Sequence, residues 1–222
     1  MPIDEASQRL ADVRARIVRS AKIAGRKPDS ITLIAISKTQ DAEAIAPLIA
    51  AGQRVFGENR VQEAEAKWPK LRETTPDIAL HLVGQLQSNK AEDAVALFDA
   101  IHSVDRPSLV GALAKAMDKA GRRPACFLQV NIGDEEQKGG CPVLELPALL
   151  REAQAADLPV QGLMCVPPLE LEPAPHFALL AKIARDHGLE GLSMGMSGDF
   201  ETAVTIGATH ARVGTALFGA RA

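Results

Sequence analysis

The chain has 222 residues, 25 of them basic and 28 acidic, so its formal net charge is −3 and it has no overall attraction to nucleic acid or anionic membranes. Aromatic residues make up only 3% of the chain, which leaves few side chains that stack on bases. Tyrosine is absent, so no phenol of this chain can act as a general acid or base.

The chain begins with a pattern typical of an amphipathic helix. Leu10, Val13, Ile17 and Ile23 recur at helical spacing among charged residues, and Gly25 marks the end of the segment. This stretch lacks the continuous apolar region of a signal peptide, and no run of about 18 apolar residues follows it. We therefore expect a soluble protein.

The cysteines indicate the compartment. Cys126, Cys141 and Cys165 are odd in number, widely spaced and free of any CxxC pattern. Such cysteines fit a reducing environment, so we expect a cytoplasmic location.

From residue 31 onward, short apolar runs alternate with helical stretches. The first run, 31–36, is nearly unbroken and fits a strand that is covered on both faces. We expect further strands over 54–57, 79–84, 100–104, 126–132, 160–166, 192–196 and 211–218. Helices are expected near 42–51, 60–75, 88–98, 107–120, 143–156, 173–187 and 198–207.

Eight strands that alternate with helices predict an α/β fold, a single TIM-type (β/α)8 barrel with an extra N-terminal helix. About 250 residues are typical of that fold. The shorter chain implies short loops, and we assign residues 1–222 to one barrel domain. An open doubly wound sheet is the alternative, but no GxGxxG motif follows the first strand.

In a barrel, functional residues gather at the carboxyl ends of the strands. Lys38 closes the first strand, where loss of solvent would favour the neutral amine that forms Schiff bases. The alternative interpretation is that Lys38 caps the strand and reaches solvent.

Two segments near the C-terminus suit a bound phosphate. Residues 194–199, Met-Gly-Met-Ser-Gly-Asp, combine glycines, the hydroxyl of Ser197 and a helix start. Residues 212–215, Arg-Val-Gly-Thr, would complete the cradle from the neighbouring strand. Alternatively, Ser197 is an ordinary N-cap of its own helix. We expect Asp199 to face away from the site, because its carboxylate would repel a phosphate.

The histidines give a weaker signal. His81 alternates with Leu80 and Leu82, so it points into the barrel, either as a hydrogen-bonded core residue or as a catalytic group. The other four histidines form no metal-ligand spacing with one another or with the cysteines, and we predict no metal.

Several ordered motifs together resemble a known family. They are Ala35-Ile-Ser-Lys38, Phe56-Gly-Glu-Asn59, Val61-Gln-Glu63, His81-Leu-Val-Gly-Gln-Leu-Gln-Ser-Asn-Lys90, Val130-Asn-Ile-Gly-Asp-Glu-Glu-Gln-Lys-Gly139, Gly162-Leu-Met-Cys165, Leu192-Ser-Met-Gly-Met-Ser-Gly-Asp199 and Arg212-Val-Gly-Thr-Ala-Leu-Phe-Gly219. They look like the YggS/PROSC family of pyridoxal phosphate homeostasis proteins, whose fold resembles the N-terminal barrel of alanine racemase. The resemblance covers nearly the whole chain.

The resemblance implies a cofactor, pyridoxal 5′-phosphate (PLP), a form of vitamin B6, held by Lys38 as an internal aldimine. It places Ser197, Gly214 and Thr215 on the phosphate and Arg212 beside the pyridine nitrogen. The other residues that it implies around the cofactor are Asn59, His81, Met164 and Ser193. Because arginine is not a useful proton donor, this pyridine nitrogen would stay unprotonated and would withdraw electrons weakly.

Two functions fit this expected site. The first is a carrier or regulator that holds PLP reversibly and maintains its intracellular level without robust catalysis. The second is a small PLP-dependent amino-acid racemase or related enzyme, with Cys165 and His81 as the nearest candidates for a second base. Racemisation needs a base on each face of the carbanion, and alanine racemase supplies one as a tyrosine from an additional domain. This chain lacks both, so we favour the carrier, with no catalytic residue assigned.

A third alternative is a barrel aldolase that uses Lys38 on a phosphorylated sugar without a cofactor. For the carrier, we expect the partners to be PLP and apo forms of PLP-dependent enzymes, with no nucleic acid and no membrane. We expect the protein to be a monomer.

Overall fold

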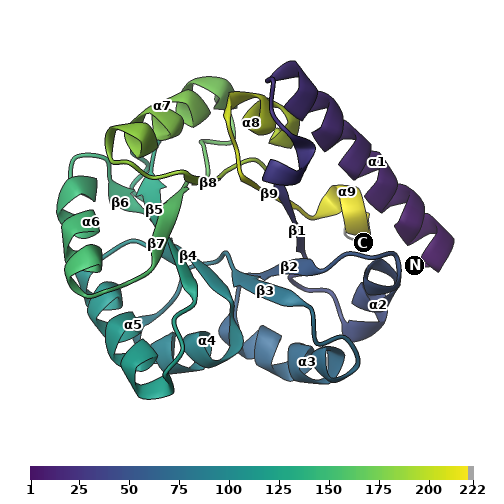
Figure 1. Ribbon diagram of the computed structural model, residues 1–222, viewed down its shortest axis with the longest axis horizontal. Helices are drawn as coiled ribbons and strands as arrows, with labels where there is room; N and C mark the ends of the chain where they lie inside the picture. Colours follow the sequence, from purple (N-terminus) through teal and green to yellow (C-terminus); the bar gives the residue numbers. More distant parts are fainter. Residues whose placement is uncertain (220–222) are drawn as a thin grey trace.

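The computed structural model describes residues 1–219, in which one N-terminal helix precedes alternating strands and helices (Figure 1). The helices are α1 Ile3–Ile23, α2 Ala42–Ala50, α3 Val61–Thr74, α4 Ala91–Leu97, α5 Pro107–Ala120, α6 Leu146–Ala155, α7 Pro173–Asp186, α8 Phe200–Ile206 and α9 Thr215–Phe218. The strands are β1 Thr32–Ile36, β2 Val55–Glu58, β3 Ala79–Leu82, β4 Ala100–Val104, β5 Ala125–Asn131, β6 Cys141–Pro142, β7 Val160–Met164, β8 Gly191–Ser193 and β9 His210–Val213.

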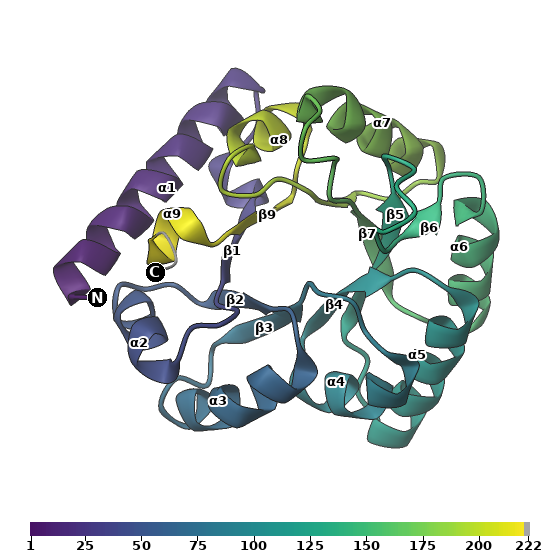
Figure 2. The same cartoon turned by 180° about the vertical axis from the view of Figure 1, so that it is seen from behind.

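The strands form a closed parallel ring. Their order is β4-β3-β2-β1-β9-β8-β7-β5, and a β4–β5 pairing closes it, while β6 pairs with β5 alone. Figures 1 and 2 show this ring from its two ends, with the helices outside it. Within residues 1–219 the predicted (β/α)8 barrel is therefore confirmed.

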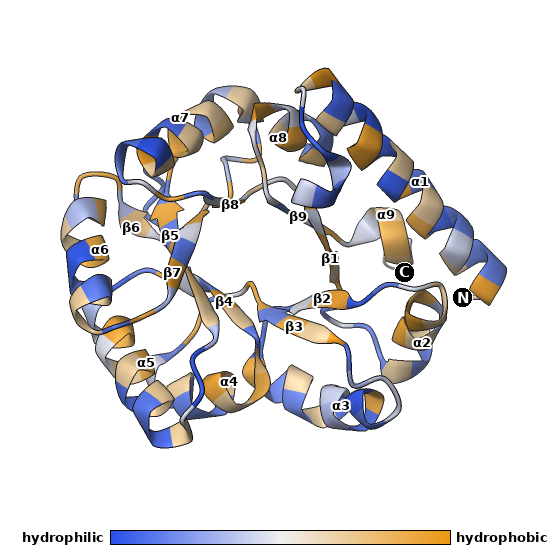
Figure 3. Cartoon of the chain, in the orientation of Figure 1, coloured by the Kyte–Doolittle hydropathy of each residue, from blue (hydrophilic) through white to orange (hydrophobic). Residues whose placement is uncertain are grey.

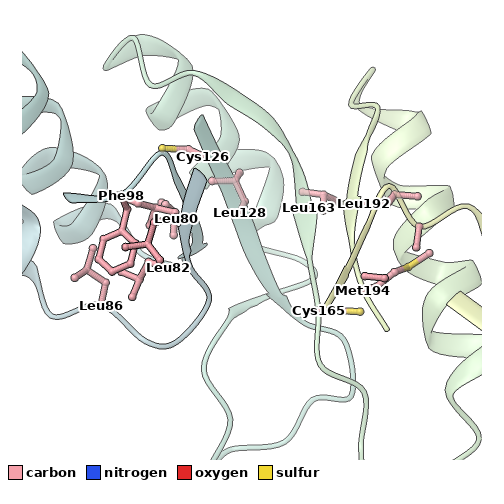
Figure 4. Close-up of a cluster of buried hydrophobic side chains, with 14 of the residues drawn as sticks. Leu80, Leu82, Leu86, Phe98, Cys126, Leu128, Leu163, Cys165, Leu192 and Met194 are labelled. Carbon is pink, nitrogen blue, oxygen red and sulfur yellow. The ribbon is translucent and has the colours of Figure 1, made fainter. Parts of the chain in front are cut away.

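The hydrophobic core lies mainly between the ring and the helices. Leu80 and Leu82 of β3 are fully buried, as are Phe98 and Leu86 nearby, and Figure 4 shows these four side chains clustered together. His81 lies between the two leucines, so the pleat directs it to the opposite face of the strand, into the barrel. The helices carry hydrophobic and hydrophilic stretches side by side (Figure 3), as expected for elements with one buried face.

The extra N-terminal helix predicted from the sequence is α1, which packs against α2, α8 and α9. Leu10, Val13 and Ile17 are its buried apolar positions. Arg16 fixes it to α8, because its guanidinium donates to Glu201 at 2.6 Å and lies 4.5 Å above the Phe200 ring. None of the helices within residues 1–219 has both the length and the apolar character needed to cross a membrane.

The expected strand over 211–218 is wrong in its second half. Strand β9 ends at Val213, Gly214 leaves the extended conformation, and Thr215–Phe218 form the short helix α9. Apolar runs of this length do not distinguish a strand from a helix by periodicity. The structure also contains β6, a two-residue strand that no sequence pattern indicated. The other predicted elements are present, with ends that differ by a few residues.

Glycine is required where β7 and β8 meet. Gly162 pairs with Gly191, and a Cβ at Gly162 would lie 2.0 Å from the Gly191 carbonyl oxygen. We predict that Gly162→Ala lowers the free energy of unfolding by about 2 kcal/mol or more, because the two backbones must separate. Urea denaturation of the purified protein measures this.

A matched control is available in α5. Gly111 is exposed, and a Cβ there would meet no atom within 4 Å. Gly111→Ala should raise the free energy of unfolding by about 0.5–1 kcal/mol, as expected for a mid-helix glycine. Equal effects of the two substitutions would contradict this account of the β7–β8 contact.

Candidate functional site

A cavity of about 440 Å³ opens where the carboxyl ends of the strands meet the following loops. Pockets of this size accommodate small organic ligands and cofactors. Six of the nine predicted site residues line it: Lys38, Asn59, Ser197, Arg212, Gly214 and Thr215. The lining also includes Gln40 and Val166, two loop residues outside the sequence motifs, and Phe218, which belongs to the last motif but lies in the unexpected helix α9.

The pairing of the first and last strands places Lys38 beside residues 212–215, one of the two segments predicted to bind a phosphate. We call this segment and residues 194–199 together the phosphate loop. Ile34 of β1 is opposite Arg212 of β9, and Ala35 is opposite Val213. Because parallel strands end at the same edge, the turn after β1 and the turn after β9 are neighbours. The half-buried Lys38 lines the cavity and makes no hydrogen bond or ion pair within residues 1–219. Its amine is therefore available to a ligand.

Ser197 joins the loops after β8 and β9. Its hydroxyl oxygen accepts a hydrogen bond from the Gly214 N–H at 3.1 Å. The alternative in which Ser197 caps its own helix is wrong, because Asp199 occupies the N-cap position of α8. The Asp199 carboxylate accepts a hydrogen bond from the Met196 N–H and does not line the cavity. That it faces away from a bound phosphate stays a prediction.

The lining of the cavity is rich in donors. The backbone N–H groups of Ser197, Gly198 and Thr215 have no hydrogen-bond partner in the described part of the chain. In the described part of the chain no aspartate or glutamate lines this cavity, whereas Lys38 and Arg212 both do. Two cationic side chains and open N–H donors without a carboxylate favour an anionic ligand.

Arg212 is a buried cation at the inner wall of the cavity. Its guanidinium donates to Ser193 Oγ at 2.7 Å and to the Cys165 carbonyl at 2.7 Å, and no carboxylate pairs with it within residues 1–219. Burial lowers the pKa of Arg212 from its ordinary value, although a guanidinium stays charged at neutral pH. The two neutral acceptors fix its orientation.

Beneath Arg212, a chain of hydrogen bonds runs through the barrel. Ser193 Oγ lies 2.8 Å from Nδ1 of His102, and Nε2 of His102 lies 3.0 Å from Nδ1 of His81. Because an arginine only donates, the direction of each hydrogen bond in the chain can be assigned. Arg212 donates to Ser193 Oγ, the Ser193 hydroxyl donates to Nδ1 of His102, and the Nε2–H of His102 donates to Nδ1 of His81. Both histidines are neutral in this assignment, since burial lowers the pKa of His81 to about 3 and that of His102 well below its ordinary value.

The three remaining predicted site residues are buried and do not line this cavity. Ser193 and His81 belong to the hydrogen-bond chain, and Met164 ends β7. Contact of these three with a cofactor stays a prediction. No cluster of three or more His, Cys, Asp and Glu side chains suited to a metal occurs within residues 1–219.

Three charged residues under the Lys38 turn were not among the predicted cofactor-binding residues, although two of them, Glu58 and Glu63, lie in the sequence motifs given above. Glu58 ends β2, and Glu63 and Lys67 lie one turn apart on α3. Two signals pointed to them. Glu58 is a charged residue that closes a short, otherwise apolar strand, and Glu63 and Lys67 have the i,i+4 spacing of a helical ion pair.

The comparisons with known proteins agree with this geometry. The family of the alanine racemase N-terminal domain matches residues 9–222. A pyridoxal phosphate homeostasis protein from Pseudomonas aeruginosa is 41% identical over 222 residues, which cover 97% of this chain and 95% of its own. The Escherichia coli protein of the same name is 38% identical over an alignment that covers 99% of this chain and 98% of the Escherichia coli protein. The chain belongs to the pyridoxal phosphate homeostasis protein family. The resemblance inferred from the sequence motifs is thus confirmed.

Solved structures place the family among related barrels. PipY of Synechococcus elongatus, in a structure with PLP bound, is 42% identical with a TM-score of 0.82, and the match covers 96% of this chain and all of PipY. An alanine racemase from Clostridium difficile is 12% identical with a TM-score of 0.68. That match covers 95% of this chain but 57% of the racemase, and it shows a shared fold alone.

The buried histidines predict a loss of stability in acid. Burial lowers the pKa of His81 from 6.5 to about 3 and that of His210 to about 4. Between pH 6.5 and pH 4 the unfolded chain binds protons that the folded protein does not, so the free energy of unfolding falls as the pH falls. Each such histidine contributes a slope of about 1.4 kcal/mol per pH unit near pH 5.

Histidine variants test this slope. In His81→Asn, urea denaturation between pH 6.5 and pH 4.5 should show a shallower fall in the free energy of unfolding than in the wild type. His176→Asn, a change on the outer helix α7, should keep the wild-type slope. The same slope in all three proteins would contradict a neutral, buried His81.

Proposed function

We propose that this protein, a single barrel domain, binds PLP in the Lys38 cavity and holds it reversibly to maintain the intracellular supply of the cofactor. The observation that carries the proposal is the meeting of a free lysine amine and an anion-binding cradle in one cavity. When bound, PLP supplies an aldehyde that condenses with a primary amine, an electron-withdrawing pyridine ring and a dianionic phosphate.

The residues fit the three parts of that molecule. Lys38 is the amine for the aldehyde, because its side chain lines the cavity without another partner in residues 1–219. Ser197, Gly214 and Thr215 hold the phosphate, and open backbone N–H groups at Ser197 and Thr215 supply donors. Arg212 donates to the pyridine nitrogen. This assignment adopts the roles that the family resemblance implies.

Arg212 favours holding over transformation. A carboxylate beside the pyridine nitrogen would keep it protonated and make the ring a strong electron sink, whereas a guanidinium donates a hydrogen bond without giving up its proton. The two neutral acceptors of Arg212, Ser193 and the Cys165 carbonyl, keep it in place. No carboxylate lines the cavity to replace it.

The cavity also lacks a second base for racemisation. Apart from Lys38 and Arg212, no titratable side chain of residues 1–219 lines it. Cys165 and His81, the candidates for that role, are buried and lie outside the lining. Burial raises the pKa of the Cys165 thiol to about 12, so a thiolate is not available at neutral pH. These features support a carrier over a racemase.

The proposal includes partners and a location. Apo forms of PLP-dependent enzymes are the recipients of the cofactor, and the protein acts as a cytoplasmic monomer. Buried cysteines without a disulfide suit a reducing compartment.

Borohydride trapping tests the assignment of Lys38. We predict that reduction of the PLP-loaded protein fixes the cofactor to Lys38, as found by peptide mass spectrometry, and that Lys38→Ala retains no fixed cofactor and loses the visible absorbance. Lys70→Ala, a change at an exposed position of α3, should behave as the wild type. A Lys38→Ala protein with unchanged absorbance and affinity would show that the assignment is wrong. A wild-type protein that binds sugar phosphates but not PLP would favour the aldolase alternative.

Amino-acid turnover tests the carrier against the enzyme. The PLP-loaded protein should interconvert or consume free amino acids far more slowly than about 1 s⁻¹, the lower end of ordinary enzymatic rates. Chiral chromatography of alanine, serine and glutamate incubations measures this. Turnover at 1 s⁻¹ or faster would refute the carrier.

A further inference from the structure

A buried ionic cluster lies under the turn that carries Lys38. Its centre is the ammonium group of Lys67 on α3, whose side chain is only 9% exposed. This Nζ lies 2.9 Å from Glu58 Oε1 and 3.0 Å from Glu63 Oε1, and it donates to the Ser37 carbonyl at 2.9 Å and the Gln40 carbonyl at 2.8 Å. Four acceptors therefore surround one cation.

The backbone contacts of this cluster enclose Lys38. Ser37 and Gln40, the two residues whose carbonyls accept from Lys67, flank Lys38 and Thr39. The Glu63 carboxylate accepts a hydrogen bond from the Thr39 N–H between them. Two side chains one helical turn apart on α3 thus hold three backbone polar groups of the turn, the carbonyls of Ser37 and Gln40 and the N–H of Thr39.

The turn needs such support. Thr39 has a φ of 63°, in the left-handed region, and it is one of only three non-glycine residues with positive φ in residues 1–219. This conformation is unfavourable for a β-branched residue and persists only where surrounding contacts impose it. The turn closes with a hydrogen bond from the Gln40 N–H to the Ser37 carbonyl at 3.0 Å, and the contacts with Glu63 and Lys67 add to this constraint, because they bond the N–H of Thr39 and the carbonyls on either side of it.

Glu58 anchors the cluster to the barrel. Its side chain is fully buried, and Oε1 accepts hydrogen bonds from Ser37 Oγ at 2.6 Å and from the Trp68 indole at 2.9 Å in addition to the Lys67 contact. Since Glu58 ends β2 and Lys67 lies on α3, the turn after β1 is bonded to both neighbouring elements.

We propose that Glu63 and Lys67 are positioning residues, which hold the turn 37–40 in its left-handed conformation and so present the Lys38 amine to the cavity before a ligand arrives. The proposal rests on the function proposed above. We call Glu63, Lys67 and their three contacts with the backbone of the turn the clamp. The proposal predicts that PLP binding weakens when the clamp is removed, although Lys38 and the phosphate loop remain intact. Pre-organisation of this kind raises affinity because less conformational freedom is lost on binding.

Glu63 offers the cleanest test, because Lys67 keeps its partner Glu58 when Glu63 is changed. In Glu63→Ala we expect the dissociation constant for PLP to rise about tenfold, the equivalent of one lost charge-assisted hydrogen bond. Glu63→Gln should stay close to the wild type, because its amide oxygen still accepts from Thr39 and Lys67. Glu65→Ala, a change at an exposed acidic residue of the same helix, is the matched control. Absorbance titration with PLP measures all four proteins.

Two further readouts separate positioning from general stability. In the protein without PLP, amide hydrogen exchange at Thr39 should be about tenfold faster in Glu63→Ala than in the wild type, with the rest of the barrel unchanged. The double variant Glu63→Ala/Thr39→Gly should recover much of the lost affinity, because glycine adopts the left-handed conformation without the clamp. A residue that merely stabilises the fold would give neither result.

Lys67→Met perturbs the cluster more strongly, because it leaves the carboxylates of Glu58 and Glu63 without the cation. If it folds, it should bind PLP more weakly than Glu63→Ala, and if it does not fold, the Glu63 series decides. Wild-type affinity and wild-type Thr39 exchange in Glu63→Ala would overturn the proposal. A wild-type protein that fails to bind PLP would refute the proposed function instead, and Thr39 exchange would still test the clamp.

Discussion

The pairing of β1 with β9 is the constraint on which the site depends. These are the first and last strands of the ring, and their register sets Ile34 beside Arg212. Only closure of the barrel brings the turn after β1 next to the loop at Gly214, although about 175 residues of chain separate them. The parallel direction of all strands then places the open ends of both turns at one edge. An amine and a set of N–H donors that have no hydrogen-bond partner within residues 1–219 thereby share a cavity.

The two sides of the barrel strands serve different purposes. Their outer faces carry apolar side chains such as Leu80 and Leu82, which belong to the hydrophobic core under the helices. The inner face of the ring instead contains a hydrogen-bonded path from Arg212 through Ser193 and His102 to His81. Because these partners are neutral, they orient the guanidinium without neutralising it. The cavity thus keeps a fixed cation at its inner wall, and no carboxylate within residues 1–219 lines the cavity beside it.

Much of this arrangement could be predicted from the sequence. The alternation of apolar runs and helical stretches indicated the barrel, and the position of Lys38 at a strand end placed it at the functional edge. Helix α9 was missed, because an apolar run after Gly214 fits a strand equally well.

The clamp of Glu63 and Lys67 was missed for a different reason. The i,i+4 spacing of Glu63 and Lys67 indicated an ion pair on the helix but not its target. The pair meets the Lys38 turn through two backbone carbonyls and one N–H, which leave no residue-type signature. Likewise, the alternation that turned His81 inward could not show that His102 and Ser193 would link it to Arg212.

Transfer of the cofactor is the most direct test of a protein that holds PLP and releases it. The PLP-loaded protein, freed of unbound cofactor, would be mixed with the apo form of a PLP-dependent enzyme, and the recovery of enzyme activity would be followed together with the visible absorbance of the barrel protein. The account predicts that enzyme activity rises as the absorbance of the barrel protein falls, with one enzyme site filled for each PLP released. An apo-enzyme that stays inactive while the same amount of free PLP activates it would contradict the account.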